Sequence, residues 1–200
     1  MLRCVAFDLD GVVISSEPSF AMFEADHGIT REQFREFFSG PYQDAMLGAV
    51  DLESVLEPTI DSWGWQDGLS AFMTTWFRSC EDPEPHVLDL IRRLRRRGLV
   101  TCVATNQDNR RAAHLDSLPW LRDHFSSRFF SCRLGVAKPD FRYFERVQSD
   151  LSIPASSILF LDDKLENVEA ARNVGWQADH VPSPEHLGAV LDRHIEDMSV

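Results

Sequence analysis

The chain has 200 residues, of which 44% are hydrophobic, and it carries a formal net charge of -12. This length and apolar content suit one α/β domain with a small additional unit, and they exclude a disordered chain. The negative charge repels phosphate backbones, so a nucleic acid partner is not expected.

The sequence also lacks the features of an exported or membrane protein. No apolar stretch approaches the length that crosses a bilayer, and the N-terminus has no basic segment followed by a long apolar one. The four cysteines show neither a C-x-x-C motif nor metal-ligand spacing. We therefore expect buried free thiols, a cytoplasmic location and no membrane partner.

The first predicted element is a short strand over residues 4–7, which read CVAF. Its residues are continuously apolar rather than alternating, which is typical of a strand buried on both faces of a parallel sheet. The strand ends abruptly in the polar run DLDG, which contains Asp8 and Asp10. These two carboxylates are thus predicted to lie at the carboxyl end of a buried strand.

Residues 16–82 have a different pattern. Phenylalanines recur there at helical spacing, and turn residues such as Gly28, Pro58 and Gly64 separate the periodic stretches. We predict several short helices and no strand in this region.

From residue 86 onward, helix-like and strand-like segments alternate. Helices are predicted over about 86–97, 109–118, 141–150 and 166–174, strands over 99–104, 129–134, 157–161 and 178–181, and a terminal helix after them. This alternation predicts an α/β fold with a Rossmann-like parallel sheet, right-handed crossovers and helices on both faces. Ligands bind such sheets at the carboxyl ends of the strands.

Polar residues follow four of the predicted strands at that edge of the sheet. They are Asp8 and Asp10 after the first strand, Thr105 and Asn106 after the second, Lys138 after the third, and Asp162 and Asp163 after the fourth. Four carboxylates this close together repel one another unless a cation lies among them. Because no His or Cys accompanies these oxygen ligands, Mg²⁺ fits better than Zn²⁺. The remaining polar groups would then hold a phosphoryl group.

These segments resemble the four signature motifs of the haloacid-dehalogenase-like superfamily. The resemblance is carried by residues 7–12 (FDLDGV), 104–106 (ATN), 138–139 (KP) and 160–163 (FLDD), which occur in the family's order. It covers the chain outside residues 16–82 and implies that those residues form a small all-α cap. The catalytic α/β core would then comprise residues 1–15 and 83–200.

The resemblance implies a Mg²⁺-dependent phosphatase that acts through an aspartyl-phosphate. Asp8 would be the nucleophile, and Asp10 would protonate the leaving oxygen and then activate water. Thr105, Asn106 and Lys138 would bind the phosphoryl oxygens.

The resemblance also implies a set of metal ligands. The carboxylates of Asp8 and Asp163 and the backbone carbonyl of Asp10 would hold Mg²⁺, while Asp162 and Asn167 would act through metal-bound waters. Lys164 departs from the family pattern, because relatives more often carry a small or neutral residue after the acidic pair.

A cap over the site suits a small phosphorylated metabolite, and a sugar phosphate is favoured. Asp10 favours phosphoryl transfer over dehalogenation, since the relatives that break carbon–halogen bonds lack this aspartate. Two alternatives stay open: a phosphomutase on the same core, and a phospho-accepting signalling or binding module.

Overall fold

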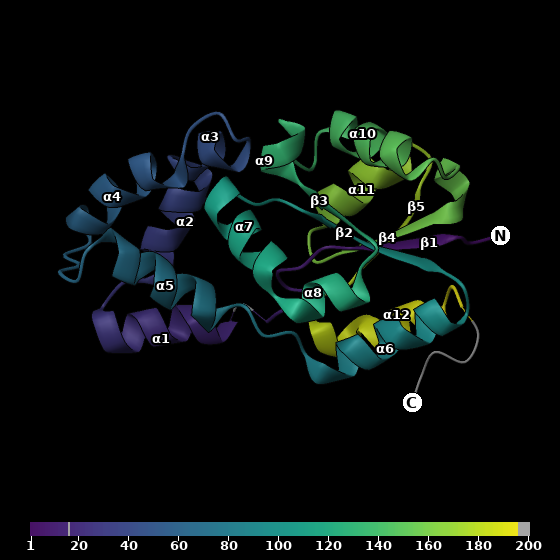
Figure 1. Cartoon of the computed structure of the whole chain (residues 1–200), viewed down its shortest axis with the longest axis horizontal. Helices are drawn as coiled ribbons and strands as arrows, with labels where there is room; N and C mark the ends of the chain where they lie inside the picture. Colours follow the sequence, from purple (N-terminus) through teal and green to yellow (C-terminus); the bar gives the residue numbers. More distant parts are fainter. Residues whose placement is uncertain (16, 196–200) are drawn as a thin grey trace.

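The computed structural model describes residues 1–15 and 17–195. Its centre is a five-stranded parallel sheet with the order β3-β2-β1-β4-β5 (Figure 1). The strands are β1 (Cys4–Phe7), β2 (Val100–Thr105), β3 (Ser127–Phe130), β4 (Ile158–Asp162) and β5 (Gln177–His180). The central strand β1 is fully buried, as its continuous apolarity predicts. The predicted α/β fold with a Rossmann-like sheet is confirmed.

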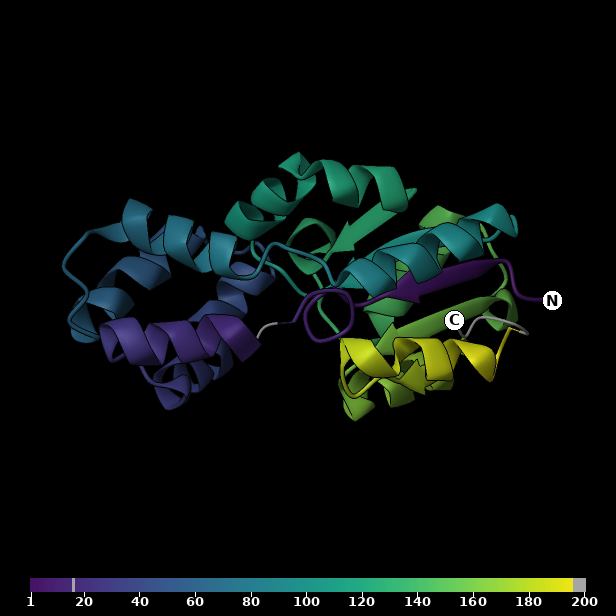
Figure 2. The same ribbon diagram turned by 90° about the horizontal axis from the view of Figure 1, so that it is seen from below.

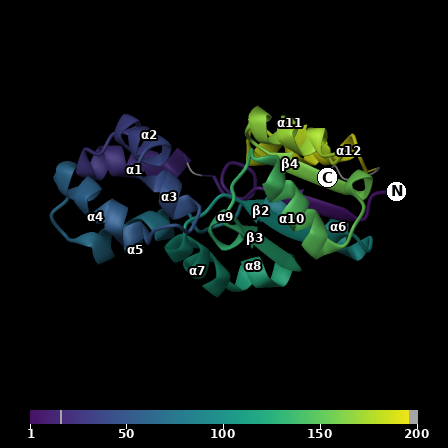
Figure 3. The ribbon, with the colours of Figure 1, turned by 90° about the horizontal axis from the view of Figure 1, so that it is seen from above.

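Helices cover both faces of the sheet (Figures 2 and 3). Successive strand residues point to opposite faces, so Val5 and Phe7 belong to one apolar cluster and Cys4 and Ala6 to the other. The first face carries α6 (Pro85–Arg96), α7 (Asn109–Ser117), α8 (Pro119–His124) and α12 (Leu187–Asp192), and the second carries α10 (Phe141–Leu151) and α11 (Leu165–Asn173). Short 3-10 turns, η1 (Ala155–Ser157) and η2 (Pro184–His186), precede β4 and α12.

The strand predicted over residues 129–134 is wrong after Phe130. β3 ends at Phe130, and the helix α9 (Ser131–Leu134) follows directly. The Ser131 hydroxyl accepts a hydrogen bond from the N–H of Gln107 at 2.9 Å and donates one to the carbonyl of Met46 at 2.7 Å, so this residue is fixed outside the sheet. Gly135 ends the helix with left-handed backbone (φ 65°), a conformation that favours glycine.

Five helices form a separate layer beyond the carboxyl ends of the strands (Figures 1 and 2). They are α1 (Glu17–His27), α2 (Arg31–Ser39), α3 (Tyr42–Met46), α4 (Leu52–Ser62) and α5 (Leu69–Ser79). Their core is aromatic: the ring of Phe23 lies 5.2 Å from the rings of both Phe34 and Phe72. These positions support residues 16–82 as an inserted cap, although Ser16 lies outside the described residues. That division of the chain stays a proposal.

The cap lies against the core mainly through α3 and the loop after it. The Tyr42 hydroxyl donates to Asp108 at the start of α7 (3.0 Å), and the Met46 carbonyl accepts from Ser131. Gly48 has φ 71°, and a Cβ there would lie 2.3 Å from the carbonyl oxygen of Cys132. Only glycine allows this approach between backbones, because any side chain would push the cap away from α9.

Across residues 1–15 and 17–195, every helix falls short of the length and apolarity that a bilayer span requires.

Candidate active site

The residues predicted to meet at the carboxyl edge of the sheet do lie together. They surround a cavity of about 340 Å³ between the core and the cap. Of the predicted site residues, the cavity is lined by Asp8, Asp10, Thr105, Asn106, Lys138, Asp163 and Asn167. Asp162 is fully buried behind this lining. Lys164 is exposed and also borders the cavity.

A buried lysine stands between two aspartates at the base of the cavity. Nζ of Lys138 lies 2.6 Å from Oδ2 of Asp162 and 3.1 Å from Oδ2 of Asp8. Burial alone would lower the pKa of Lys138, but the charges of Asp162 and Asp8 raise it above its ordinary value. Asp162 also accepts from the N–H of Lys164 at 2.8 Å and from the Asn167 amide at 3.0 Å, so both of its oxygens have donors.

Asn106 fixes the backbone that carries the lysine. Its Nδ2 donates to the Lys138 carbonyl and its Oδ1 accepts from the Lys138 N–H, both at 2.9 Å. The amide of Asn106 is therefore committed to positioning Lys138, and a contact with a phosphoryl group would have to come from its backbone.

Gly11 allows the acidic residues after β1 and β4 to approach each other. Its φ is 87°, and a Cβ at this position would lie 2.8 Å from both Cγ and Oδ2 of Asp163. Any other residue would displace the Asp163 carboxylate from the cavity, so the glycine is needed both for its backbone conformation and for this contact.

The site offers oxygen atoms that fit a hard cation. Asp8, Asp162 and Asp163 each place a carboxylate oxygen within 4.8 Å of the others. Oδ1 of Asp163 and Oδ1 of Asn167 are buried and have no hydrogen-bond partner within the described part of the chain. Buried oxygens without a donor are costly; coordination to Mg²⁺ would satisfy Asp163, and a metal-bound water would satisfy Asn167. The donor set therefore fits the metal that the sequence predicts.

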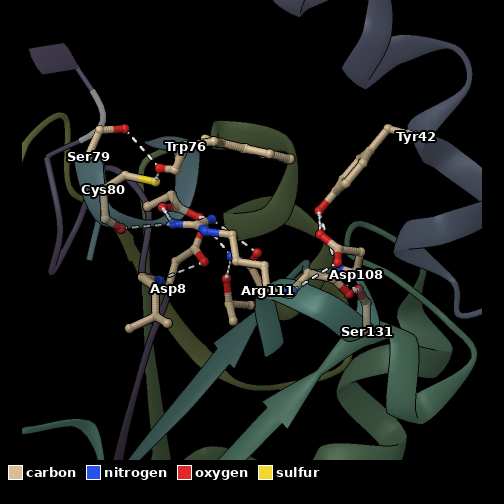
Figure 4. A network of polar contacts seen from close by, with 12 residues as sticks. Asp8, Tyr42, Trp76, Ser79, Cys80, Asp108, Arg111 and Ser131 are labelled. Atoms are coloured by element: carbon tan, nitrogen blue, oxygen red, sulfur yellow. Dashed lines mark hydrogen bonds and ion pairs between the residues drawn. The ribbon is translucent and has the colours of Figure 1, made fainter. Parts of the chain in front are cut away.

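Asp10 is held by two residues that follow β2, and Figure 4 labels one of them, Arg111. Arg111 forms a bidentate pair with it, with N–O distances of 2.6 and 2.7 Å, and Nε2 of Gln107 donates to Oδ2 at 2.7 Å. Arg111 also donates to the carbonyl of Cys80, just after α5, at 3.1 Å. Burial would raise the pKa of Asp10, but the charge and hydrogen bonds of Arg111 and the bond from Gln107 bring it below its ordinary value.

A family model described as haloacid dehalogenase-like hydrolase matches residues 2–175. The chain belongs to this family. The charged cavity at the carboxyl edge of the sheet therefore belongs to a hydrolase of this family.

Named relatives of this hydrolase include phosphatases. A sesquiterpene phosphatase of Aspergillus oryzae is 32% identical over 102 residues, which cover 51% of this chain and 52% of that protein. An N-acetylmuramic acid 6-phosphate phosphatase of Pseudomonas aeruginosa is 26% identical over 228 residues, which cover 98% of this chain and 97% of that protein. The chain spans about half of the first relative and smaller parts of several others.

A solved structure shares the fold. It is a family enzyme from Bacteroides thetaiotaomicron in complex with magnesium and inorganic phosphate, with a TM-score of 0.74 and 20% identity over 90% of this chain and 94% of that one. At this identity the likeness concerns the fold alone.

The sequence motifs did not reveal Arg111 and Gln107 as part of this hydrolase's site. One signal was available, however. Arg111 lies in the first turn of α7, three residues after the N-cap Asp108, and a cation there opposes the helix dipole. An arginine at this unfavourable position indicates a specific partner, and Asp10 is that partner.

Two carboxyls of the site have raised pKa values. Burial, with the nearby charges of Asp162 and Asp163, raises the pKa of Asp8 to about 7, although Lys138 opposes the shift. Burial and the charge of Asp162 raise the pKa of Asp163 to about 6. At pH values below its ordinary pKa, a carboxyl whose pKa is raised by folding adds to the free energy of unfolding. This contribution to stability is lost as the pH rises through the raised pKa. For the metal-free hydrolase, that loss falls between about pH 4 and pH 7.

The substitution Asp8→Asn is expected to make the metal-free hydrolase more stable than the wild type at pH 8. The amide cannot ionise, so it avoids a destabilisation on the order of a few kcal/mol that the Asp8 carboxylate suffers at this pH. At pH 4, where the buried carboxyl is protonated, the two proteins should be nearly equal. Urea unfolding in EDTA at several pH values measures this difference. A difference that stays constant between pH 4 and pH 8 would contradict the raised pKa of Asp8.

Proposed function

We propose that this hydrolase is a phosphatase that converts a small phosphate monoester and water into an alcohol and inorganic phosphate, using Mg²⁺. The observation that carries the proposal is the pairing of the buried Lys138 with Asp8, next to the unpartnered oxygen of Asp163. A cation on one side and a metal site on the other would neutralise the charges of a nucleophilic carboxylate and a phosphoryl group. The named phosphatases among the relatives support the same reaction.

The metal would be held by the carboxylates of Asp8 and Asp163 and by the backbone carbonyl of Asp10. Bound Mg²⁺ would supply positive charge at the transferring phosphoryl oxygens. Asp162 and Asn167 would not bind the metal directly and would act through metal-bound waters. Because Asp162 has donors on both oxygens, its role in this proposal is to position Lys138 and Asn167.

In the proposed first step, an oxygen of Asp8 attacks phosphorus and the ester oxygen leaves with a proton from Asp10. In the second step, Asp10 takes a proton from water, which attacks the aspartyl-phosphate and releases inorganic phosphate. Thr105, Lys138 and the backbone of Asn106 would hold the phosphoryl oxygens during both steps.

The bidentate pair with Arg111 keeps Asp10 as a carboxylate. This state suits the second step, because a carboxylate can accept a proton from water. The first step requires Asp10 to bind a proton, and Arg111 opposes that. The arrangement in this structure is therefore the one that suits the second step.

The proposed reaction is tested by measuring the inorganic phosphate released from a panel of phosphate monoesters, with Mg²⁺ and with EDTA. Mg²⁺-dependent release is the expected result. Hydrolysis that is equally fast in EDTA would contradict the metal requirement, and release from none of the esters would contradict the phosphatase.

Mg²⁺ is expected to raise the melting temperature of the wild type, because it binds the folded site and not the unfolded chain. Asp163→Ala removes one repelling carboxylate and one proposed ligand. Without metal, this variant should melt at the wild-type temperature or above, and millimolar Mg²⁺ should raise it little. As the control, Asp116→Ala removes a carboxylate that pairs with Arg128 and Arg133 on the core, and it should keep the Mg²⁺ response. A wild-type response in Asp163→Ala would move the ligand role to Asp162.

A further inference from the structure

The cavity has two chemically different walls. The core contributes the charged and polar residues described above, whereas the cap contributes mostly apolar side chains. These come from four helices: Phe20 from α1, Phe38 from α2, Met46 from α3 and Trp76 from α5. We call these four side chains the cap wall. Figure 4 shows the ring of Trp76 edge-on above the Asp8 and Arg111 cluster.

The aromatic side chains of the cap wall support one another. The ring of Phe38 lies 5.7 Å from that of Trp76 and 5.2 Å from that of Tyr42. Phe20 packs edge-on against Phe34 at 5.3 Å, inside the cap. These contacts hold the rings in place, so the wall is a formed apolar surface.

The polar groups beside the cap wall already have partners. The Tyr42 hydroxyl donates to Oδ2 of Asp108 and accepts from the Asp108 N–H at 3.1 Å. The Ser19 hydroxyl lies 2.7 Å from that of Ser79, which donates to the Trp76 carbonyl at 2.8 Å. The amide N–H of Gln43 donates to the carbonyl of Phe38. Among the cap side chains that the structure describes, few donors are therefore left for hydroxyl groups of a ligand.

We propose that the substrate is the phosphate monoester of a small apolar alcohol, of the alkyl, prenyl or arylmethyl type, rather than a sugar phosphate. This inference rests on the proposed function, because the phosphoryl group must occupy the charged wall beside Asp8. The alcohol part of the ester then faces Phe38, Met46 and Trp76. Sugar hydroxyls against this wall would lose hydrogen bonds to water and gain few others, and each is expected to lower kcat/KM by about tenfold.

The size of the cavity limits the alcohol. A volume of about 340 Å³ is at the lower end of the range for small-molecule sites, and the phosphoryl group occupies part of it. The remaining space suits a short branched chain or a single ring, and it does not suit a long lipid.

The test compares esters with the same chemistry at the reacting oxygen. 3-Methylbutyl phosphate and benzyl phosphate are the apolar pair, and ribose 5-phosphate and glucose 6-phosphate are the polar pair. All four are monoesters of primary alcohols. With Mg²⁺ and the wild-type protein, kcat/KM for phosphate release is expected to be about 10²-fold or more higher for the apolar pair. Asp8→Asn serves as the blank.

Two variants locate the binding site of the alcohol. Phe38→Gln and Met46→Gln place amides in the cap wall, and each should reduce the preference for apolar esters by about tenfold, mainly through KM. Having two variants protects the test against one that fails to fold, which thermal melts would reveal. Phe141→Gln is the matched control, because Phe141 is an exposed ring on α10 outside the cavity, and it should change nothing.

The outcomes separate the two proposals. Asp8-dependent release that favours the sugar phosphates would overturn the apolar alcohol and leave the phosphatase standing. An unchanged preference in both folded cap-wall variants would also overturn it, because the alcohol would then bind elsewhere. Release from none of the four esters would overturn the proposed function itself.

Discussion

Asp8→Asn is expected to abolish phosphate release, with a loss of about 10⁴-fold or more in kcat. An amide cannot attack phosphorus and is a poor ligand for Mg²⁺, so the covalent route is closed. The same variant should be more stable than the wild type at pH 8 without metal. Its amide does not ionise, whereas the buried Asp8 carboxyl, whose pKa is raised, is ionised at this pH. Activity and urea unfolding of one preparation therefore distinguish a lost nucleophile from a lost fold.

The control for Asp8→Asn is Asp116→Asn, an equivalent change on α7 that removes a carboxylate paired with Arg128 and Arg133. It should retain near wild-type turnover. If a folded Asp8→Asn protein kept comparable activity, the aspartyl-phosphate route would have to be abandoned.

Arg111→Ala is expected to lower kcat/KM by about 10–10²-fold, because Asp10 then loses the bidentate pair that orients it. Asp10→Asn should cost more, about 10²–10⁴-fold, since it removes the proton transfer itself. If Arg111 acts through Asp10, the double variant should be no slower than Asp10→Asn alone. Arg111→Lys should restore part of the rate, since it returns one donor to Asp10.

Arg110→Ala is the matched control for Arg111. Arg110 is the neighbouring residue of α7, but it is exposed and pairs with Asp51 of the cap instead. Its replacement should leave kcat/KM nearly unchanged. Additive losses in the Arg111→Ala, Asp10→Asn double variant would mean that Arg111 contacts the substrate independently of Asp10.

The sequence predicts the parallel sheet and the meeting of polar residues because both follow from local patterns. Continuous apolar runs mark buried strands, and the carboxyl ends of parallel strands share one edge. We could therefore predict that Asp8, Thr105 and Asp162 lie close together, although the order of the strands was not known. The same reasoning fails at residues 131–134 (SCRL), because so short a mixed segment fits either a strand or a helix, and the Ser131 contacts decide for the helix.

The hydrogen bonds that hold Asp10, and the apolar cap wall, each combine residues that are far apart in the sequence. Arg111 reaches Asp10 only because Asp108 starts α7 at the end of β2, which sets the direction of the arginine. The cap wall combines four helices whose relative positions leave no trace in the periodicity of any one of them. Such features require the tertiary structure.

The cap contacts the core through α3 and the loop after it, which carry Tyr42 and Gly48, and Figure 1 shows α3 on the side of the cap opposite the end of α5. We expect the cap to turn about the chain connection after α5, the hinge side, and to separate from the core at the α3 contacts, the latch side. Arg111 binds the Cys80 carbonyl on the hinge side, so Asp10 should remain held while the latch opens. We expect substrate and product to pass through the latch side while the proton-transfer apparatus stays assembled, ready before each closure.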